Sequence, residues 1–219
     1  MPVARPFQGY YAILDVKGTS VDVTRILRHA DSLLDARPCC LQLRGKGLGP
    51  ADLCALGHAL RQPCAKRQIP LCVNDRLDVA LVVGADAVHI GQHDLPLADV
   101  VRLRDRFGLA RLKVGISAQT LEQAEAAAAA GADYIGFGPV FSTESKADAD
   151  PAVGLAALRQ VASRVRVPVV AIGGISLDNV ASVALAGASG AAAIAAVDNA
   201  PDPTQAGRRI GQAFAAAAP

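Results

Sequence analysis

Short apolar runs alternate with longer helix-like stretches along the chain, and this alternation limits the possible folds more than any other feature. The helix-like stretches include residues 50–67, 121–132 and 177–188, and a last one ends the chain. Alternating strands and helices predict a parallel sheet with crossover connections. The strand-like runs are residues 10–16, 39–44, 70–75, 87–91, 113–118, 134–140, 168–174 and 191–196.

Eight such pairs in 219 residues predict one (β/α)8 barrel, a TIM barrel, as a single domain over residues 1–219. The segments GADAVHIG, GADYIGFG and GASGAAAI begin at 84, 131 and 187, and each fits a glycine that ends a helix before a buried strand. Residues 142–154 are polar and long for a connection. Because they follow the sixth strand-like run, they are a candidate active-site loop.

Composition and charge exclude several classes of partner. The chain has 22 Lys and Arg against 20 Asp and Glu and no long basic block, so neither nucleic acid nor a membrane surface is an expected partner. The five cysteines lie in the first third without a C-x-x-C pair, which indicates reduced thiols in a cytoplasmic protein. The sequence shows neither a secretory signal nor an apolar run of membrane-spanning length. Small molecules are therefore the expected ligands of a soluble protein.

Charged residues follow several of the strand-like runs, and in a (β/α)8 barrel functional side chains lie at these carboxyl ends. Asp75 and Asp94 follow adjacent runs, so their carboxylates can converge on one Mg²⁺. Proteins usually hold this ion through one or two carboxylates together with substrate phosphates. Arg44, Lys46 and Lys146 would place three cations around the same mouth, a set that suits a di- or triphosphate.

Each of these residues also has an ordinary structural interpretation. Asp75 suits the cap of the helix that follows it, and Asp94 suits a cap or a turn equally well. A single surface Arg or Lys is more often a solvated charge. Gly173 and Gly174 form a tight turn whether or not their N–H groups bind a second phosphate. The hypothesis of phosphate chemistry therefore depends on the barrel, which brings these residues together.

The histidines do not indicate a catalytic base. His89 lies inside an apolar run and is expected to be a hydrogen-bonded core residue, whereas His29 and His58 lie on expected helices, at the surface. No recognisable Ser/His/Asp or Cys/His signature is present. The residues favour phosphate chemistry without covalent catalysis.

Five segments of the chain form a recognisable set: QLRGK (42–46), VNDRLDVALVVGADAVHIGQHDLP (73–96), GISAQT (115–120), GADYIGFGPVFSTESK (131–146) and VVAIGGI (169–175). In this order they resemble the thiamine phosphate synthase family, and the resemblance extends from about residue 10 to residue 197. The resemblance implies a (β/α)8 transferase of an alkyl group. Such an enzyme joins 4-amino-5-hydroxymethyl-2-methylpyrimidine diphosphate to 4-methyl-5-(2-hydroxyethyl)thiazole phosphate with Mg²⁺ as cofactor, and it releases thiamine monophosphate and diphosphate.

The resemblance also implies roles for the residues that match the family's motifs. The cations and Mg²⁺ would neutralise charge on the departing diphosphate while a serine donates a hydrogen bond, so that the C–O bond breaks ahead of attack by the thiazole nitrogen. The implied catalytic residues are Arg44, Lys46, Ser117 and Lys146, and the implied Mg²⁺ ligands are Asp75 and Asp94. Gln42 and Asn74 would bind the pyrimidine diphosphate, and Thr143, Ser145, Gly174, Ile194 and Ala195 the thiazole phosphate.

The chain departs from the family's usual motifs at a few positions. Gln119 stands where His is usual and Ala195 where Ser is common, and both belong to the thiazole side, although a backbone N–H is retained at 195. Gly45 replaces an acidic residue, and Ser142 and Ser145 replace Pro and Thr.

Two alternatives remain at this point. One is a thiazole tautomerase of the same fold, which typically lacks the magnesium and diphosphate residues and carries a His after the sixth strand. The other is a non-catalytic paralogue that binds thiamine precursors. A homo-oligomer is compatible with either.

Overall fold

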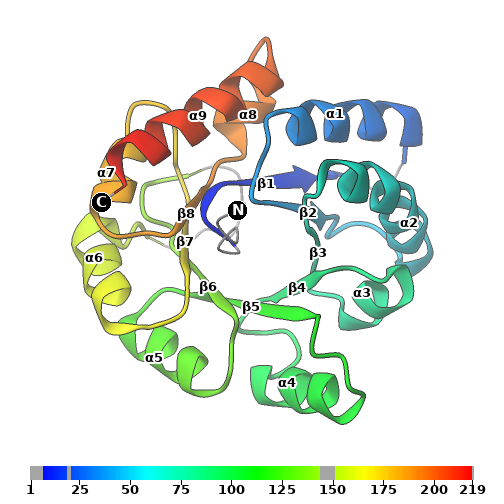
Figure 1. The fold of residues 1–219 in the computed structure, drawn as a ribbon, viewed down its shortest axis with the longest axis horizontal. Helices are drawn as coiled ribbons and strands as arrows, with labels where there is room; N and C mark the ends of the chain where they lie inside the picture. Colours follow the sequence, from blue (N-terminus) through cyan, green and yellow to red (C-terminus); the bar gives the residue numbers. More distant parts are fainter. Residues whose placement is uncertain (1–6, 19–20, 144–150, 219) are drawn as a thin grey trace.

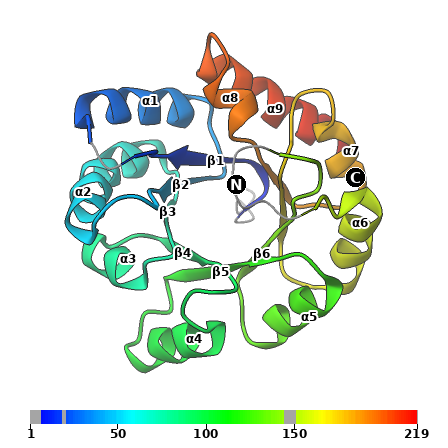
Figure 2. The ribbon, with the colours of Figure 1, turned by 180° about the vertical axis from the view of Figure 1, so that it is seen from behind.

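The computed structural model describes residues 7–18, 21–143 and 151–218. It confirms the (β/α)8 barrel: eight parallel strands pair in sequence order, and β8 pairs with β1 to close the ring. Figures 1 and 2 show the strands at the centre and the helices around them. The strands are β1 (Gly9–Asp15), β2 (Cys40–Arg44), β3 (Leu71–Asn74), β4 (Ala87–Ile90), β5 (Lys113–Ala118), β6 (Tyr134–Phe137), β7 (Val169–Ile172) and β8 (Gly190–Ala192).

The helices follow the strands around the outside of the barrel. Two of them, α8 and α9, follow β8, where the sequence predicts one. The helices of the described residues are α1 (Val23–Asp35), α2 (Pro50–Arg67), α3 (Leu77–Val83), α4 (Leu97–Arg106), α5 (Leu121–Ala129), α6 (Gly154–Arg164), α7 (Val180–Leu185), α8 (Ala195–Asp198) and α9 (Pro203–Ala217).

The end of the barrel differs from the sequence-based prediction. The run 191–196 is expected to be a strand, but β8 ends at Ala192 and α8 begins at Ala195. The segment is nearly all alanine, the best helix former, and it has one β-branched residue, so local propensity does not favour a long strand. Ile194 and Ala195 therefore lie at the start of a helix and not on a strand.

The repeated glycines end their helices as the sequence predicts. Gly84 is the C-cap of α3 with a φ of 65°, and Gly131 and Gly187 follow the C-caps of α5 and α7 with φ of 89° and 91°. These backbone angles are left-handed, and glycine adopts them without steric cost.

Two apolar clusters stabilise the barrel. The larger one lies between the sheet and the surrounding helices, and the smaller one fills the barrel interior. Phe7 precedes β1, is 2% exposed, and stacks on Tyr134 with the ring centroids 3.9 Å apart. Phe7 thus fills the barrel interior from the end at which β1 begins, away from the carboxyl ends of the strands.

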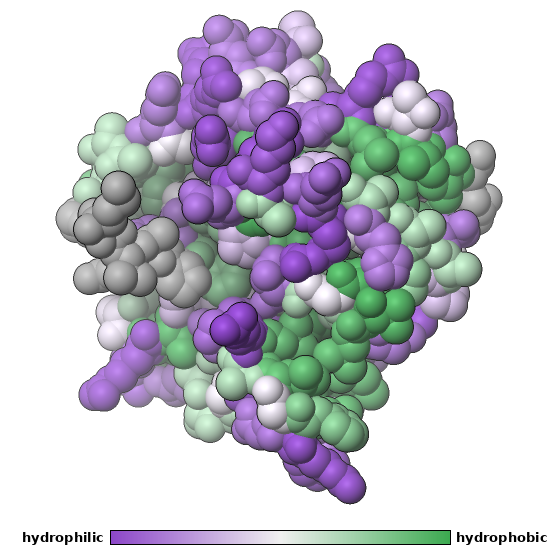
Figure 3. Space-filling model, turned by 45° about the vertical axis from the view of Figure 1, so that its right-hand side comes forward, coloured by the Kyte–Doolittle hydropathy of each residue, from purple (hydrophilic) through white to green (hydrophobic). Residues whose placement is uncertain are grey.

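Polar and apolar areas alternate on the face shown in Figure 3. The most exposed large apolar side chains of the described residues are Val23, Leu81, Val82, Leu95, Phe107 and Leu185. No helix in the described part of the chain is long and apolar enough to cross a membrane. The five cysteines are free thiols.

Candidate active site

Two adjoining cavities open at the carboxyl ends of the strands. One has a volume of about 170 Å³ and the other about 380 Å³, and Lys46, Ser117 and Ile194 line both. The smaller cavity is also lined by Gln42, Arg44, Asn74, Asp75 and Asp94. Thr143, Gly174 and Ala195 line the larger one. The structure thus brings together every predicted site residue that it describes, whereas Ser145 and Lys146 lie outside the described residues.

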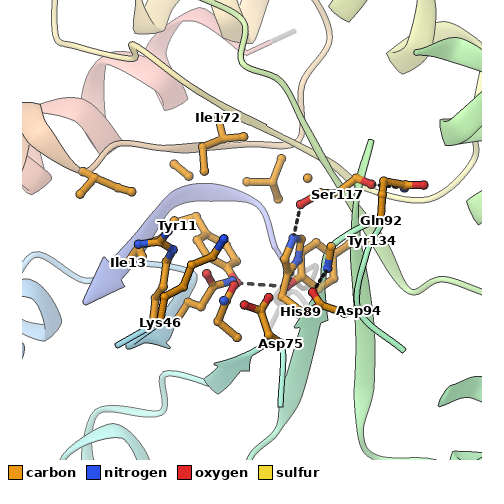
Figure 4. A pocket seen from close by; sticks show the side chains of 18 of the residues that line it. Tyr11, Ile13, Lys46, Asp75, His89, Gln92, Asp94, Ser117, Tyr134 and Ile172 are labelled. Carbon is orange, nitrogen blue, oxygen red and sulfur yellow. Dashed lines mark hydrogen bonds between the residues drawn. The ribbon is translucent and has the colours of Figure 1, made fainter. Parts of the chain in front are cut away.

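Asp75 and Asp94 form an acidic pair on one side of the smaller cavity (Figure 4). Asp75 directly follows β3 and has a left-handed φ of 61°, and its N–H donates to the His89 carbonyl at 2.7 Å. Burial, a hydrogen bond shared with Asp94 and repulsion by the Asp94 charge raise the Asp75 pKa from 3.8 to about 6. Below about pH 6 the two carboxylates can therefore share a proton, and the charges of Lys46 and Arg44 limit the rise of the Asp75 pKa.

The structural interpretations of the two aspartates have different outcomes. The capping interpretation of Asp75 is wrong, because Arg76 occupies the N-cap of α3 and no side chain caps that helix. The turn interpretation of Asp94 is confirmed, because its Oδ2 accepts the Gly91 N–H at 2.6 Å. Asp94 is held by this turn and faces Asp75 at the same time.

The acidic pair has the donor chemistry that a hard divalent cation requires. Carboxylate oxygens are the ligands Mg²⁺ prefers, and the ion keeps several waters and binds through one or two carboxylates plus a substrate phosphate. A cation between the two groups would replace their shared proton. No group of three or more His, Cys, Asp or Glu suited to a metal occurs within the described ranges, so this two-carboxylate site would remain incomplete without a ligand phosphate.

Arg44 is fixed by a buried ion pair. Its Nη1 donates to Oδ1 of Asp15 on the neighbouring strand, and the two side chains are only 11% and 2% exposed. The β1–β2 register places the two residues opposite each other. Because Asp15 holds one end of the guanidinium, the remaining donors can face the cavity. Lys46 extends into the same space as Asp75 and Ser117 (Figure 4).

A buried chain of polar side chains crosses the barrel interior, and the sequence-based reasoning missed most of it. Gln42 Nε2 donates to Tyr11 Oη at 2.9 Å, and Tyr11 and Tyr134 hydroxyls are 3.0 Å apart. His89 Nδ1 lies 3.0 Å from Tyr134 Oη, and its Nε2 lies 3.0 Å from Ser117 Oγ (Figure 4). His89 is confirmed as a hydrogen-bonded core residue, yet one of its partners is a predicted site residue.

In the sequence, these hydrogen-bonded side chains are indicated only by the pattern of the strands. Tyr11, His89 and Tyr134 occupy apolar strand runs, so each reads as a core position. They point into the barrel interior, and only the order of strands around the ring shows that their polar ends meet.

The larger cavity is bordered by the turn after β7. Gly173 and Gly174 have φ of 96° and 62°, and a Cβ at Gly174 would lie 2.4 Å from the Ser142 carbonyl oxygen. The tight turn is therefore confirmed, and the absence of side chains lets Pro139, Phe141 and Ser142 lie against it. Gln119 also lines this cavity, and its N–H donates to the Gln123 side chain at 2.8 Å. The turn and Gln119 thus border a space large enough for a second ligand.

Comparison with known proteins gives one consistent family. A family model described as thiamine monophosphate synthase matches residues 11–197. A thiamine-phosphate synthase from Roseiflexus sp. (strain RS-1) is 47% identical over 81% of this chain and 73% of its own length. One from Methanospirillum hungatei is 46% identical over 78% of this chain and 81% of its own.

Solved structures agree with the sequence matches. A thiamine phosphate pyrophosphorylase from Pyrococcus furiosus aligns with a TM-score of 0.83 at 31% identity, over 96% of both chains. A 3-hexulose-6-phosphate synthase aligns with a TM-score of 0.71 at 20% identity, which shows the shared barrel fold alone.

Proposed function

Because the chain belongs to the thiamine monophosphate synthase family, we propose that it joins 4-amino-5-hydroxymethyl-2-methylpyrimidine diphosphate to 4-methyl-5-(2-hydroxyethyl)thiazole phosphate. In this reaction the C–O bond to the diphosphate breaks and a C–N bond to the thiazole nitrogen forms, so the products are thiamine monophosphate and diphosphate. The observation that carries the proposal is the single cavity in which the Asp75–Asp94 pair faces Arg44, Lys46 and Ser117.

Asp75 and Asp94 are the residues that would hold Mg²⁺. When bound, the ion would lower the free energy of the negative charge on the departing diphosphate. Its site requires the substrate as a ligand, because the protein offers two carboxylates and Mg²⁺ favours additional phosphate oxygens. Metal and pyrimidine diphosphate should therefore bind interdependently.

The cations and Ser117 act on the diphosphate itself. Arg44 presents a guanidinium fork preoriented by Asp15, and Lys46 adds a point charge. Ser117 donates a hydrogen bond to an oxygen of the leaving group. Such fixed donors stabilise the negative charge that develops on the leaving diphosphate, so the C–O bond can break before the thiazole nitrogen attacks. Lys146 joins this set by its motif, and it lies outside the described residues.

The larger cavity would bind the thiazole phosphate. Thr143, Gly174, Ile194 and Ala195 line it, and Ser145 belongs to the same motif as Thr143. Holding the phosphate away from the reacting nitrogen would aim that nitrogen at the smaller cavity, where the cation forms. Positioning of this kind replaces an encounter between two free molecules.

The test is to incubate the purified protein with both substrates and Mg²⁺, with and without EDTA, and to measure thiamine monophosphate by mass spectrometry. We expect product that EDTA abolishes. Asp75→Ala should also abolish it, whereas Asp78→Asn should not, because Asp78 is an exposed partner of Arg76 outside both cavities. A folded protein without product would contradict the proposal and favour the tautomerase or the binding paralogue. Full activity of Asp75→Ala would contradict the site.

A further inference from the structure

We propose that His89 is a positioning residue whose Nε2–H holds the Ser117 oxygen and thereby turns the Ser117 hydroxyl proton into the cavity. This inference deepens the proposed function and rests on it for the role of Ser117. It assigns the buried chain Gln42–Tyr11–Tyr134–His89 to orienting one hydroxyl group, in addition to filling the barrel.

The direction of the hydrogen bonds follows from the chemistry of their first member. An amide nitrogen only donates, so Gln42 Nε2 donates to Tyr11 Oη at 2.9 Å. In the orientation that we propose, Tyr11 gives its single proton to Tyr134 Oη at 3.0 Å. Tyr134 gives its own proton to His89 Nδ1 at 3.0 Å, which is a stronger acceptor than the Cys72 sulfur 3.6 Å away. An accepting Nδ1 places the ring proton on Nε2.

The same reasoning applies to the other nitrogen of the His89 imidazole. Nε2–H donates to Ser117 Oγ at 3.0 Å, so the serine oxygen is an acceptor in this contact. The serine proton is not used there and can point to a ligand oxygen in the cavities that Ser117 lines. With the opposite tautomer, Ser117 would donate to His89 and have no proton for the leaving diphosphate.

Two strand glycines make room for these rings. A Cβ at Gly136 would lie 2.9 Å from His89 Cε1, and one at Gly115 would lie 2.1 Å from Tyr134 Cζ. The register pairs Gly115 with Tyr134 and Ser117 with Gly136, so both glycines lie beside the chain they accommodate. Phe7 also stacks on the Tyr134 ring. His89 and Tyr134 are therefore confined on several sides, as a positioning device requires.

The first test reads the tautomer directly and needs no substrate. Nitrogen-15 NMR of protein labelled at its four histidines, with His89→Gln to assign the signal, should show His89 protonated on Nε2 alone at neutral pH. Tyr134→Phe removes the donor to Nδ1 and should give a mixture of tautomers. Tyr10→Phe is the matched control, because the buried Tyr10 hydroxyl has no hydrogen-bond partner among the described residues. A proton on Nδ1, or an imidazolium, in the unaltered protein would overturn the inference.

The second test measures what the tautomer does for the reaction. His89→Leu should lower kcat about tenfold to a hundredfold, with a change in KM below about threefold, because the donor to the leaving group is misdirected. His89→Gln carries an amide N–H near the Nε2 position and should recover most of this loss. In a Ser117→Ala background, His89→Leu should have almost no further effect.

Other outcomes separate the inference from the proposed function. Additive losses from Ser117→Ala and His89→Leu, or failure of a folded His89→Gln protein to recover kcat, would reduce His89 to a packing residue and overturn the inference. An unaltered protein that forms no thiamine monophosphate would contradict the proposed function, and the NMR experiment would still decide the tautomer.

Discussion

Asp75 shows how a single residue can lower the stability of the metal-free protein. Its pKa of about 6 lies above the ordinary 3.8, so between these values the folded state holds a proton that the unfolded chain releases. The stabilising contribution of this proton is complete below about pH 4. It is lost as the pH rises through 6, where two charged carboxylates face each other.

Replacing Asp75 by Asn should remove this dependence. In urea unfolding without metal, Asp75→Asn should be about 1 kcal/mol more stable than the unaltered protein above pH 6, a figure reduced for the solvent that reaches this half-buried group. The two proteins should converge below pH 4. Millimolar Mg²⁺ together with the pyrimidine diphosphate should raise the stability of the unaltered protein more than that of the variant. Identical pH profiles would contradict the shared-proton description.

Arg44 depends on Asp15 for both stability and orientation. Asp15→Asn leaves a nearly buried guanidinium without its counter-charge, so unfolding should become easier by about 3 kcal/mol. The KM for the pyrimidine diphosphate should also rise, because the fork is no longer fixed. Arg61→Lys is the control: its partner Asp86 is 47% exposed, and such surface pairs contribute little. An unchanged KM in a folded Asp15→Asn protein would show that the orientation of Arg44 does not contribute to binding of the pyrimidine diphosphate.

The elements differ in how well the sequence predicts them. Alternation of apolar runs finds all eight strands, and α2 begins and ends at the predicted residues 50 and 67, because proline and charged residues mark its ends. The apolar pattern fails at the alanine-rich end of β8, because a short run of apolar residues does not distinguish a strand from a helix and the helix propensity of alanine decides there. It also misses Tyr11 and Tyr134 as cavity residues, since contacts across the barrel have no signature in local sequence.

One glycine in a strand and one in a helix test how closely neighbouring side chains pack against the backbone. Gly115→Ala in β5 would drive a methyl group into the Tyr134 ring and should destabilise the protein by about 2 kcal/mol or more. Gly211→Ala in α9 is the matched change, because its Cβ would meet Tyr10 Cβ at an ordinary 3.5 Å. A helix interior favours alanine, so this variant should gain about 0.5 to 1 kcal/mol. Equal effects of the two changes on urea unfolding would contradict this account.

At the scale of the whole molecule, α9 connects the end of the chain to its beginning. Its residues Ile210 and Phe214 are 1% and 2% exposed, and Gly207 lets the helix approach the Tyr10 ring on β1. Thr204 donates to the Ser32 carbonyl of α1 at 2.9 Å. Because β1 also pairs with β8, α9 covers the seam at which the barrel closes.

A variant truncated after Ala200 should therefore lose not only α9 but also the stability of the β1–β8 pairing. Without α9 the outer face of β1 is exposed at the seam, so the β1–β8 pairing should become the weakest part of the ring. We expect amide hydrogens of β1 and β8 to exchange faster than those of β4 and β5, and urea unfolding to lose its single cooperative transition. A chain that ends after Ala215 keeps Ile210 and Phe214 and should unfold like the full chain. Uniform protection of all eight strands in the shorter chain would show that the strands close the barrel without the helix.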